Sequence, residues 1–270
     1  MQTEMFPHLI QIGGFSLTSY GFMAALGALA AIFIFDSNRQ HAALSETQAT
    51  TIVVLGILSG LIGARIYYVI QFYDTVFRFR SFWKIFKIWE GGLVFYGGPL
   101  LALLVIFLYC RKHRLNFAAV LDICAPALAV AHALGRVGCF LNGCCVSTLH
   151  CTLPWGVTYP EMSEAGRVTG AVAVHPVQLY ESCFDLVIAI PLFYIARKGR
   201  NGAATGCYMS LYGLWRFAIE FLRHEPKYGI FTSAQYISIA FFAAGTIFLL
   251  TAIFRKQNDS AETADNNEEC

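Results

Sequence analysis

The sequence contains few charged residues. Charged side chains make up 13% of its 270 residues and hydrophobic side chains make up 57%, whereas roughly 25% of an ordinary soluble domain is charged. The net charge is only +2, and the basic residues are spread over short stretches instead of forming one stripe. We therefore expect an integral membrane protein and no nucleic-acid partner.

A basic leader is missing as well. No Lys or Arg precedes Arg39, although a cleavable signal peptide begins with basic residues, so we expect the first apolar run to stay as a helix. No linker, low-complexity stretch or obvious repeat precedes the acidic end of the sequence. The expected organisation is a single membrane domain over residues 1–256 and a disordered acidic tail over residues 257–270.

Long apolar runs dominate the rest of the chain. A helix needs roughly 18 apolar residues to cross a hydrocarbon core about 30 Å thick. The sequence predicts an all-α bundle of about seven transmembrane helices, at residues 15–35, 51–72, 92–110, 117–141, 177–196, 205–223 and 232–254.

The basic residues of the connecting segments predict the orientation of the bundle. If the N-terminus lies outside, the cytoplasmic side carries Arg39, Arg111, Lys112, Arg114, Arg197, Lys198, Arg200, Arg255 and Lys256. Fewer basic residues then lie outside, and most of those belong to one segment, residues 77–90. The positive-inside rule therefore favours an outer N-terminus and a cytoplasmic C-terminus.

That outer segment, FRFRSFWKIFKIWE, has the pattern of an amphipathic helix. Arg80, Lys84 and Lys87 fall on one side of a helical wheel, opposite an apolar face. A helix of this kind lies in the membrane interface, so we expect it on the outer face of the bundle, either as an anchor or as a site that recruits lipid.

Several polar side chains fall inside the predicted spans, where each charge costs at least roughly 2.5–3.5 kcal/mol. Those that share a helix face are Tyr212, Arg216, Glu220 and Arg223 in one span and His132, Arg136 and Cys139 in another. One interpretation is that the arginines pair with acidic residues of the chain, namely Asp122, Glu181, Asp185 and Glu220. The other is an anionic ligand, and we favour a phosphate in a dry cavity because the arginine fork donates two hydrogen bonds and keeps its charge.

The cysteines raise the question of a metal or redox site, above all Cys139, Cys144, Cys145 and Cys151. No C-x-x-C pair occurs in the chain, and the spacing is not that of a zinc ribbon. The favoured interpretation is free thiols or a disulfide between Cys151 and either Cys144 or Cys145. Metal binding and thiol redox chemistry are the alternatives, and we expect no metal and no cofactor.

Seven blocks carry a more specific pattern between about residue 14 and residue 250. They are Tyr20-Gly21-Phe22-Met23, GLIGARIYYV (60–69), IWEGGLVFYGG (88–98), LDICAPALAVAHALGRVGCFLNG (121–143), PWGVTYP (154–160), HPVQLYE (175–181) and LYGLWRFAIEFLR (211–223). In this order they resemble the prolipoprotein diacylglyceryl transferases of bacterial inner membranes. Several blocks in the right order are more specific than any one of them.

The resemblance implies an inner-membrane enzyme that transfers the diacylglyceryl group of phosphatidylglycerol to a thiol. The thiol belongs to the lipobox cysteine of a prolipoprotein, and the products are a thioether and glycerol phosphate. The implied partners are phosphatidylglycerol, prolipoprotein signal peptides and membrane lipids. Since the substrate supplies the nucleophile, the enzyme needs only to activate that thiol and to stabilise the charge of the leaving phosphate.

The resemblance also assigns residues. Arg136 corresponds to a headgroup-binding arginine, Arg216 and Glu220 match the RFxxEFxR motif of the family, and Tyr20 matches its first-helix tyrosine. We expect Tyr96, Tyr20 and Arg216 to be catalytic. The expected substrate-binding residues are Arg136, Arg216, Glu220, Arg223, Asn142, His175, Gln178 and Tyr180.

Four positions depart from the usual pattern of the family. Tyr96 replaces a histidine often proposed as the base, Cys139 an asparagine, Cys144 a glutamate and His132 a glutamine. A tyrosine, with a reference pKa of about 10, is a poor base unless a neighbouring arginine lowers that value. Two alternatives to the enzyme therefore stay open: a non-enzymatic phospholipid-binding membrane protein, and a redox or metal membrane protein that uses the four cysteines named above.

Overall fold

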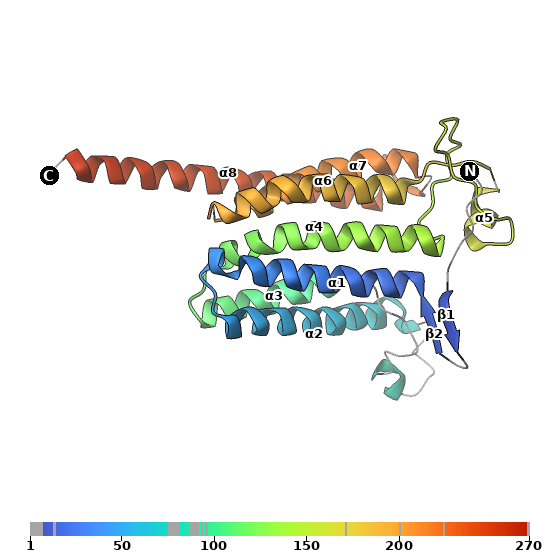
Figure 1. Cartoon of the computed structure of the whole chain (residues 1–270), viewed down its shortest axis with the longest axis horizontal. Coiled ribbons are helices and arrows are strands. Elements are labelled where there is room, and N and C mark those ends of the chain that lie inside the picture. Colours follow the sequence, from blue (N-terminus) through green and yellow to red (C-terminus); the bar gives the residue numbers. More distant parts are fainter. Residues whose placement is uncertain are drawn as a thin grey trace. The chain divides into compact units, whose positions relative to one another are not determined.

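The computed structural model describes residues 8–12, 15–74, 82–86, 92, 94, 97–170, 172–199, 201–223 and 225–268. The chain forms two compact units, which we call the larger unit (residues 1–41 and 118–270) and the smaller unit (residues 42–117). Most of the described residues are helical (Figure 1), so the predicted all-α class is confirmed. The sequence did not indicate the division into two units, and the single domain over residues 1–256 stays a prediction.

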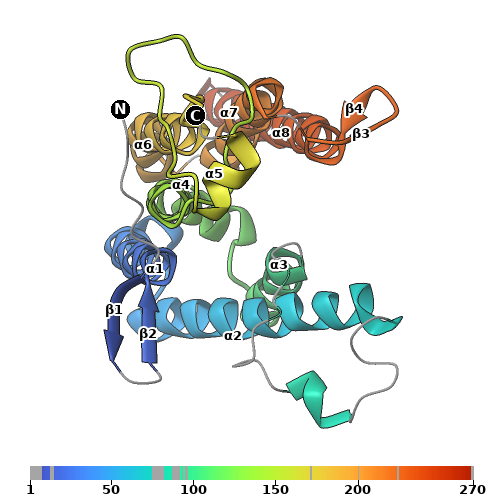
Figure 2. The same ribbon diagram turned by 90° about the vertical axis from the view of Figure 1, so that its right-hand side faces the viewer.

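The larger unit is a helical bundle with two short antiparallel hairpins. Its elements are β1 (His8–Ile12), β2 (Phe15–Thr18), α1 (Ser19–Asn38), α4 (Phe117–Asn142), α5 (Glu164–Thr169), α6 (Val177–Arg197), α7 (Ala203–Ile219), the 3-10 helix η5 (Glu220–Leu222), β3 (Lys227–Tyr228), β4 (Phe231–Thr232) and α8 (Ser233–Glu268). Figure 2 shows α4, α6 and α7 beside one another. Small and branched side chains form the core between them: Ala125, Ala129, Ile188, Ala189, Leu192, Ala196 and Ala204.

The smaller unit contains α2 (Glu46–Gln71), the 3-10 helix η3 (Phe82–Phe86) and α3 (Gly97–Lys112). A Cβ atom on Gly63 of α2 would run into the backbone carbonyl of Gly97 of α3, and the reverse is also true. The glycine at the start of α3 therefore lets two helix backbones approach closely. Apart from η3, the amphipathic segment predicted over residues 77–90 lies outside the described residues.

Arg65 of α2 bonds two backbone carbonyls of the smaller unit. The side chain is buried, and it donates from Nε to the carbonyl of Ile85 at 2.8 Å and from Nη1 to the carbonyl of Gly92 at 2.9 Å. These bonds hold the chain that leads from α2 to α3. They give this intramembrane arginine a structural role.

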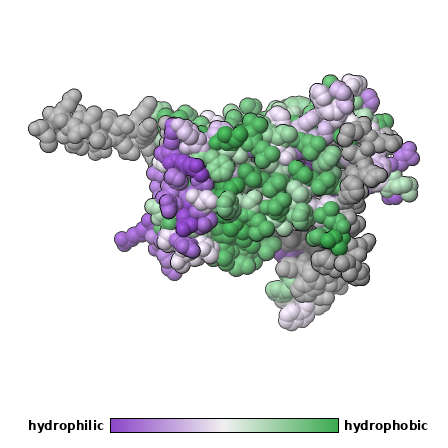
Figure 3. All heavy atoms as spheres, viewed as in Figure 1, coloured by the Kyte–Doolittle hydropathy of each residue, from purple (hydrophilic) through white to green (hydrophobic). Residues whose placement is uncertain are grey.

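The long helices coincide with the seven apolar runs, and five of the described helices are long and apolar enough to span a membrane. The other two, α3 and α7, have 16 and 17 residues, so a count of seven spans stays a prediction. Side chains such as Phe33 and Ile190 are exposed. Figure 3 shows apolar residues gathered over the middle of the helices and hydrophilic residues towards their ends, as expected of a surface that faces lipid.

Two helix ends differ from the prediction. The first run was placed too early, because Phe15–Thr18 form β2 and the Thr18 side chain caps α1 by accepting a hydrogen bond from the Gly21 N–H at 3.1 Å. At the other end of the chain, α8 extends to Glu268, beyond the predicted span end at residue 254 (Figure 1), and the disordered tail over residues 257–270 stays a prediction. No Gly or Pro follows Gly245, so no helix-breaking residue ends α8 earlier.

Asp122 of α4 caps the start of α7. Its Oδ2 accepts from the Gly202 N–H at 2.7 Å, and its Oδ1 accepts from both the N–H and the hydroxyl of Thr205 at 2.9 Å. The carboxylate is buried and satisfies donors that a helix start leaves unpaired. The suggestion that Asp122 balances an arginine was therefore wrong.

The segment between α4 and α6 packs around its own small core. Val157 and Val174 exchange two backbone hydrogen bonds of 3.0 Å, and Tyr159 and Ala165 are buried beside them. This packing fixes the chain that follows α4, where the cysteines lie.

Candidate active site

Glu181 of α6 lies between two arginines from neighbouring helices. Its Oε2 pairs with Nε of Arg136 on α4, and its Oε1 accepts from Nη1 of Arg216 on α7 at 3.0 Å. Nη2 of Arg216 lies 2.9 Å from Oε2 of Glu220, one helical turn further on. We call these four residues the arginine–glutamate chain.

Glu220 also accepts a hydrogen bond from β4, just before α8 begins. Its Oε1 accepts from the Thr232 hydroxyl at 2.9 Å. Thr232 in turn exchanges hydrogen bonds with Gln235, whose Oε1 accepts from the Thr232 N–H at 3.1 Å. All three residues are buried, so the carboxylate that orients Arg216 has a fixed position itself.

Within the arginine–glutamate chain, the two carboxylates are more deeply buried than the two arginines. The side chains of Glu181 and Glu220 are 1% and 2% exposed, and those of Arg136 and Arg216 are 14% and 15% exposed. Pairing between arginine and acid, one of the two interpretations of the sequence, is therefore what the structure shows for these residues. In the described part of the chain Arg136 meets a carboxylate only through Nε, and the guanidinium carries further N–H donors that suit an anion.

A second polar pair lies one turn before Arg136 on α4. Nδ1 of His132 is 2.7 Å from Oδ2 of the buried Asp185 on α6. The His132 ring also packs edge to face on Tyr212 of α7, with 5.2 Å between ring centroids. The predicted polar faces of α4 and α7 thus meet a row of acidic residues on α6.

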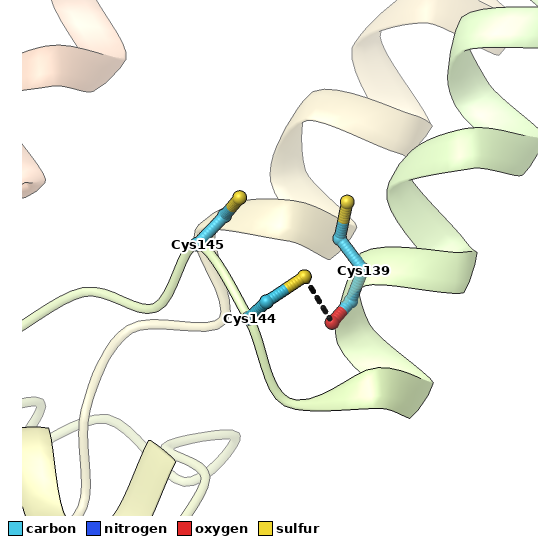
Figure 4. Close-up of side chains that lie close together, drawn as sticks. All are labelled: Cys139, Cys144 and Cys145. Atoms are coloured by element: carbon cyan, nitrogen blue, oxygen red, sulfur yellow. Dashed lines mark hydrogen bonds between the residues drawn. The ribbon is translucent and has the colours of Figure 1, made fainter. Parts of the chain in front are cut away.

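Three cysteines gather where α4 ends. The Sγ atoms of Cys139, Cys144 and Cys145 all lie within 4.8 Å of one another. Figure 4 shows Cys139 on the last turns of the helix and the other two on the turn that follows, with the Cys144 thiol donating to the Cys139 carbonyl at 3.7 Å. We call these three residues the thiol cluster.

Cys151 does not belong to the thiol cluster. It is buried in the loop, where its N–H donates to the carbonyl of Ala173 at 2.8 Å. All cysteines in the described residues are free thiols. The suggested disulfide between Cys151 and Cys144 or Cys145 is absent from the described structure, because the loop core holds Cys151 apart from the other two.

Tyr20 meets the thiol cluster from α1. A Cβ atom on Gly138 would lie 2.9 Å from Cβ of Met23 and 3.3 Å from Cα of Tyr20, so this glycine lets α1 pack directly on α4. The Tyr20 phenol is close enough to Arg136 and to the three thiols to interact with them electrostatically. The structure thus brings together Tyr20, Arg136 and the thiol cluster.

Arg223 directly follows the 3-10 helix η5. Its Nη2 is 3.1 Å from Oε1 of Glu225. The positive charges of Arg223 and Arg136 both stabilise the thiolate form of Cys145. Hydrogen bonds from the thiols of Cys139 and Cys144, followed by these two positive charges, lower the pKa of Cys145 below that of an ordinary thiol. Cys145 is therefore the thiol of the cluster that loses its proton more readily than Cys144.

Gln178 and Asn142 support the cysteine turn. Nε2 of the buried Gln178 donates to the Cys144 carbonyl at 2.9 Å and lies 3.4 Å from the Tyr159 hydroxyl. Asn142 is the last residue of α4 and lies two positions before Cys144. Both residues were predicted to bind substrate, and in the structure Gln178 bonds the turn that Asn142 precedes.

His175 and Tyr180 form a separate group. The Tyr180 hydroxyl accepts from Nε1 of Trp155 at 2.7 Å and lies 3.2 Å from Nδ1 of His175. These side chains join the loop to the start of α6, and no contact of theirs within the described residues reaches the arginine–glutamate chain. Tyr96 lies outside the described residues.

The sequence analysis did not place Glu181 among the site residues, although it is the centre of the arginine–glutamate chain. The available signal was a carboxylate inside an apolar span, which is rare unless it pairs or functions. Thr232 carried no comparable signal, because its role depends on where β4 meets η5.

Comparison with known proteins places the chain in a family. The family model described as prolipoprotein diacylglyceryl transferase matches residues 7–251. The chain belongs to the prolipoprotein diacylglyceryl transferase family.

Relatives of the chain carry the name phosphatidylglycerol–prolipoprotein diacylglyceryl transferase. The relative from Clostridium tetani is 31% identical over 94% of this chain and 100% of its own length. A second, numbered 2, from Clostridium perfringens is 32% identical over 88% of this chain and 91% of its own length, and one from Finegoldia magna is 34% identical over 91% and 94%. The resemblance seen in the sequence is therefore confirmed, and the chain is a helical membrane protein of a transferase family.

Proposed function

We propose that this chain transfers the diacylglyceryl group of phosphatidylglycerol to the thiol of a lipobox cysteine in prolipoproteins. The observation that supports the proposal is the arginine–glutamate chain, because buried carboxylates orient two arginines whose guanidinium groups suit a phosphate. The names of the relatives support the two substrates.

The reaction is a displacement at carbon. The thiolate sulfur attacks the carbon of the diacylglyceryl group that carries the phosphate. A C–S bond forms as the bond between this carbon and the phosphate oxygen breaks, and the electron pair of the broken bond leaves with glycerol phosphate. Arg136 and Arg216 stabilise the charge that develops on the leaving group. A preorganised donor of this kind is typically worth about 10²–10³-fold in rate, and the buried Glu181 and Glu220 preorganise both arginines.

The remaining site residues divide by position. Arg223 and Tyr20 are close enough to the thiol cluster to interact with it electrostatically, and we assign them to substrate binding and catalysis respectively. Gln178 bonds the turn that carries Cys144, Asn142 directly precedes that turn, and both are assigned to substrate binding. His175 and Tyr180 bind substrate at the loop side of α6. Tyr96 is the candidate proton acceptor that the resemblance supplies.

The proposed location is the bacterial inner membrane, with the N-terminus outside and the C-terminus cytoplasmic. The greater number of basic residues on the cytoplasmic side supports this orientation. Reporter fusions after Lys256 and within residues 160–170 test it, and a periplasmic signal from the fusion after Lys256 would invert the topology.

One assay tests the function directly. Purified protein in detergent is mixed with phosphatidylglycerol and a lipobox peptide, and mass spectrometry follows the diacylglyceryl adduct of the peptide and the release of glycerol phosphate. The same peptide with Ser in place of Cys is the control. Binding of phosphatidylglycerol without any adduct would instead assign the non-enzymatic lipid-binding function.

A further inference from the structure

The backbone after α4 brings the thiol cluster together. Gly143 and Cys145 both have positive φ, 69° and 58°, and this is unusual for a residue with a side chain, such as Cys145. The two left-handed residues turn the chain back towards the end of α4, so that Cys144 and Cys145 face Cys139 (Figure 4). Strain of this kind is kept where the surrounding structure imposes it, often at functional sites.

The spacing of the three sulfurs suits a metal ion. Their separations are at most 4.8 Å, and the sulfurs of a tetrahedral zinc site are roughly 3.8 Å apart, as follows from a Zn–S bond of about 2.3 Å. Small side-chain rotations close this difference. Soft thiolate ligands select zinc or copper(I) over magnesium, calcium or manganese.

The burial of the cysteines leaves one side of the cluster open. Cys139 is buried, Cys144 is half-buried and Cys145 is exposed. Three protein ligands with an open fourth position are typical of catalytic zinc, whereas structural zinc sites have four protein ligands. The fourth cysteine nearby, Cys151, is buried elsewhere in the loop and does not close the site.

We propose that Cys139, Cys144 and Cys145 bind Zn²⁺, and that the open fourth position of the metal takes the thiol of the substrate cysteine. This inference rests on the proposed function for the identity of that thiol. It also departs from the expectation of no metal, because the sequence spacing did not show that the three sulfurs converge.

Such a site activates the substrate thiol without a protein base. A thiol that coordinates a metal ion is deprotonated, so the substrate thiol gives its proton to solvent when it binds. The zinc-bound sulfur then attacks the diacylglyceryl carbon that carries the phosphate. The C–S bond forms, and the electron pair of the broken C–O bond leaves with glycerol phosphate. The thioether product carries no charge and leaves the metal.

The neighbours of the cluster fit this reaction. The Arg136 guanidinium is close enough to Cys139 and Cys145 to interact with them electrostatically, and it belongs to the arginine–glutamate chain. A substrate thiolate bound to the metal and a phosphate bound to the arginines would therefore be neighbours. Arg223 and Arg136 also offset the negative charge that three or four thiolates leave around Zn²⁺.

The first measurement is the zinc content of protein purified under reducing, anaerobic conditions. Mass spectrometry of metals should find about one zinc per chain, as a single such site requires. Cys139→Ser, Cys144→Ser and Cys145→Ser should each lose the metal. Cys183→Ser is the matched control, because Cys183 is an exposed cysteine of α6 outside the cluster, and it should keep both zinc and transfer activity.

The second measurement uses Co²⁺ in place of zinc. Thiolate ligands give cobalt a near-ultraviolet charge-transfer band and tetrahedral d–d bands, and a lipobox peptide should strengthen the former, whereas its Ser analogue should not. An unchanged spectrum with the Cys peptide overturns the role in thiol activation. A preparation that binds no zinc, whether its thiols are free or joined in a disulfide, overturns the site.

The outcomes separate this inference from the proposed function. Full transfer by metal-free protein overturns the role of zinc in thiol activation and leaves the transferase function intact. A zinc-bound protein whose cobalt spectrum responds to the peptide, but which forms no adduct, keeps the site and overturns the transferase function.

Discussion

Arg136 of α4 and Glu181 of α6 form an ion pair in which the carboxylate is 1% exposed and the arginine 14% exposed. The Glu181 carboxylate is more deeply buried than the Arg136 guanidinium and fixes the orientation of that group. Because desolvation offsets much of the attraction within a buried pair, the main consequence of this contact is orientation. The guanidinium carries further N–H donors besides the Nε–H that meets Glu181.

Replacing Arg136 by Ala should reduce kcat/KM for transfer by at least about 10²-fold, since it removes a preorganised donor to the leaving phosphate. The variant should stay folded, because Glu181 keeps its bond to Arg216. Arg167→Ala, which changes an exposed arginine of α5, is the matched control for the loss of a positive charge. Turnover close to that of the parent would remove Arg136 from the mechanism.

Arg216→Lys should also slow transfer, although it keeps the charge. Arg216 uses Nη1 for Glu181 and Nη2 for Glu220, and one ammonium group cannot reproduce that planar fork. Steady-state kinetics should show a fall in kcat with little change in thermal stability. Unaltered kinetics would mean that Arg216 acts as a point charge.

Glu181→Ala should destabilise the protein, because it leaves two arginines without their shared buried partner. Breaking a buried pair from one side costs about 3–5 kcal/mol. Thermal unfolding in detergent, followed by circular dichroism, should show a lower midpoint than for Glu181→Gln, which keeps a hydrogen-bond acceptor. Equal midpoints for the two variants and the parent would contradict the central place of Glu181.

Asp122→Ala should lower stability without a direct effect on chemistry. The substitution removes the cap of α7, and the loss of a capping side chain costs about 0.5–2 kcal/mol. The unfolding midpoint should fall, while kcat/KM per folded molecule stays that of the parent. A selective loss of kcat with no change in the midpoint would give Asp122 a role in the reaction.

Tyr96→Phe distinguishes two ways of activating the substrate thiol. A general base at position 96 predicts a loss of roughly 10²–10⁴-fold, with Tyr96→His active. Activation by zinc predicts a much smaller change, and we expect this result because a phenol with a reference pKa of about 10 accepts a proton poorly. A loss in the first range, measured at saturating peptide, would speak for Tyr96 and against the zinc site.

The helices were predictable because their signal is local. Apolar runs gave α4 and α6 to within a residue or two at each end, and the charges inside those spans identified Arg136 and Arg216 before any contact was known. The partners of these arginines were harder to assign. Asp122 and Glu181 are both carboxylates in spans, and only the packing of α4, α6 and α7 shows that one caps a helix and the other joins two arginines.

The thiol cluster could not be predicted from spacing. Cys139, Cys144 and Cys145 converge because two left-handed residues reverse the chain at positions 143 and 145, and nothing in the sequence requires a cysteine to adopt positive φ. Cys151 looked equally suitable in the sequence, yet the loop core holds it elsewhere.

Helix α6 links the thiol cluster to the arginine–glutamate chain. Gln178 holds the turn that carries Cys144, and Glu181, three residues later, holds Arg136 and Arg216. Three residues of α-helix correspond to a rise of about 4.5 Å, so α6 fixes the spacing between the contact to Cys144 and the contacts to the two arginines. Inserting one residue between these positions would rotate Gln178 by about 100° relative to Glu181, so the two contacts could not both form even though every residue named here remained in the sequence.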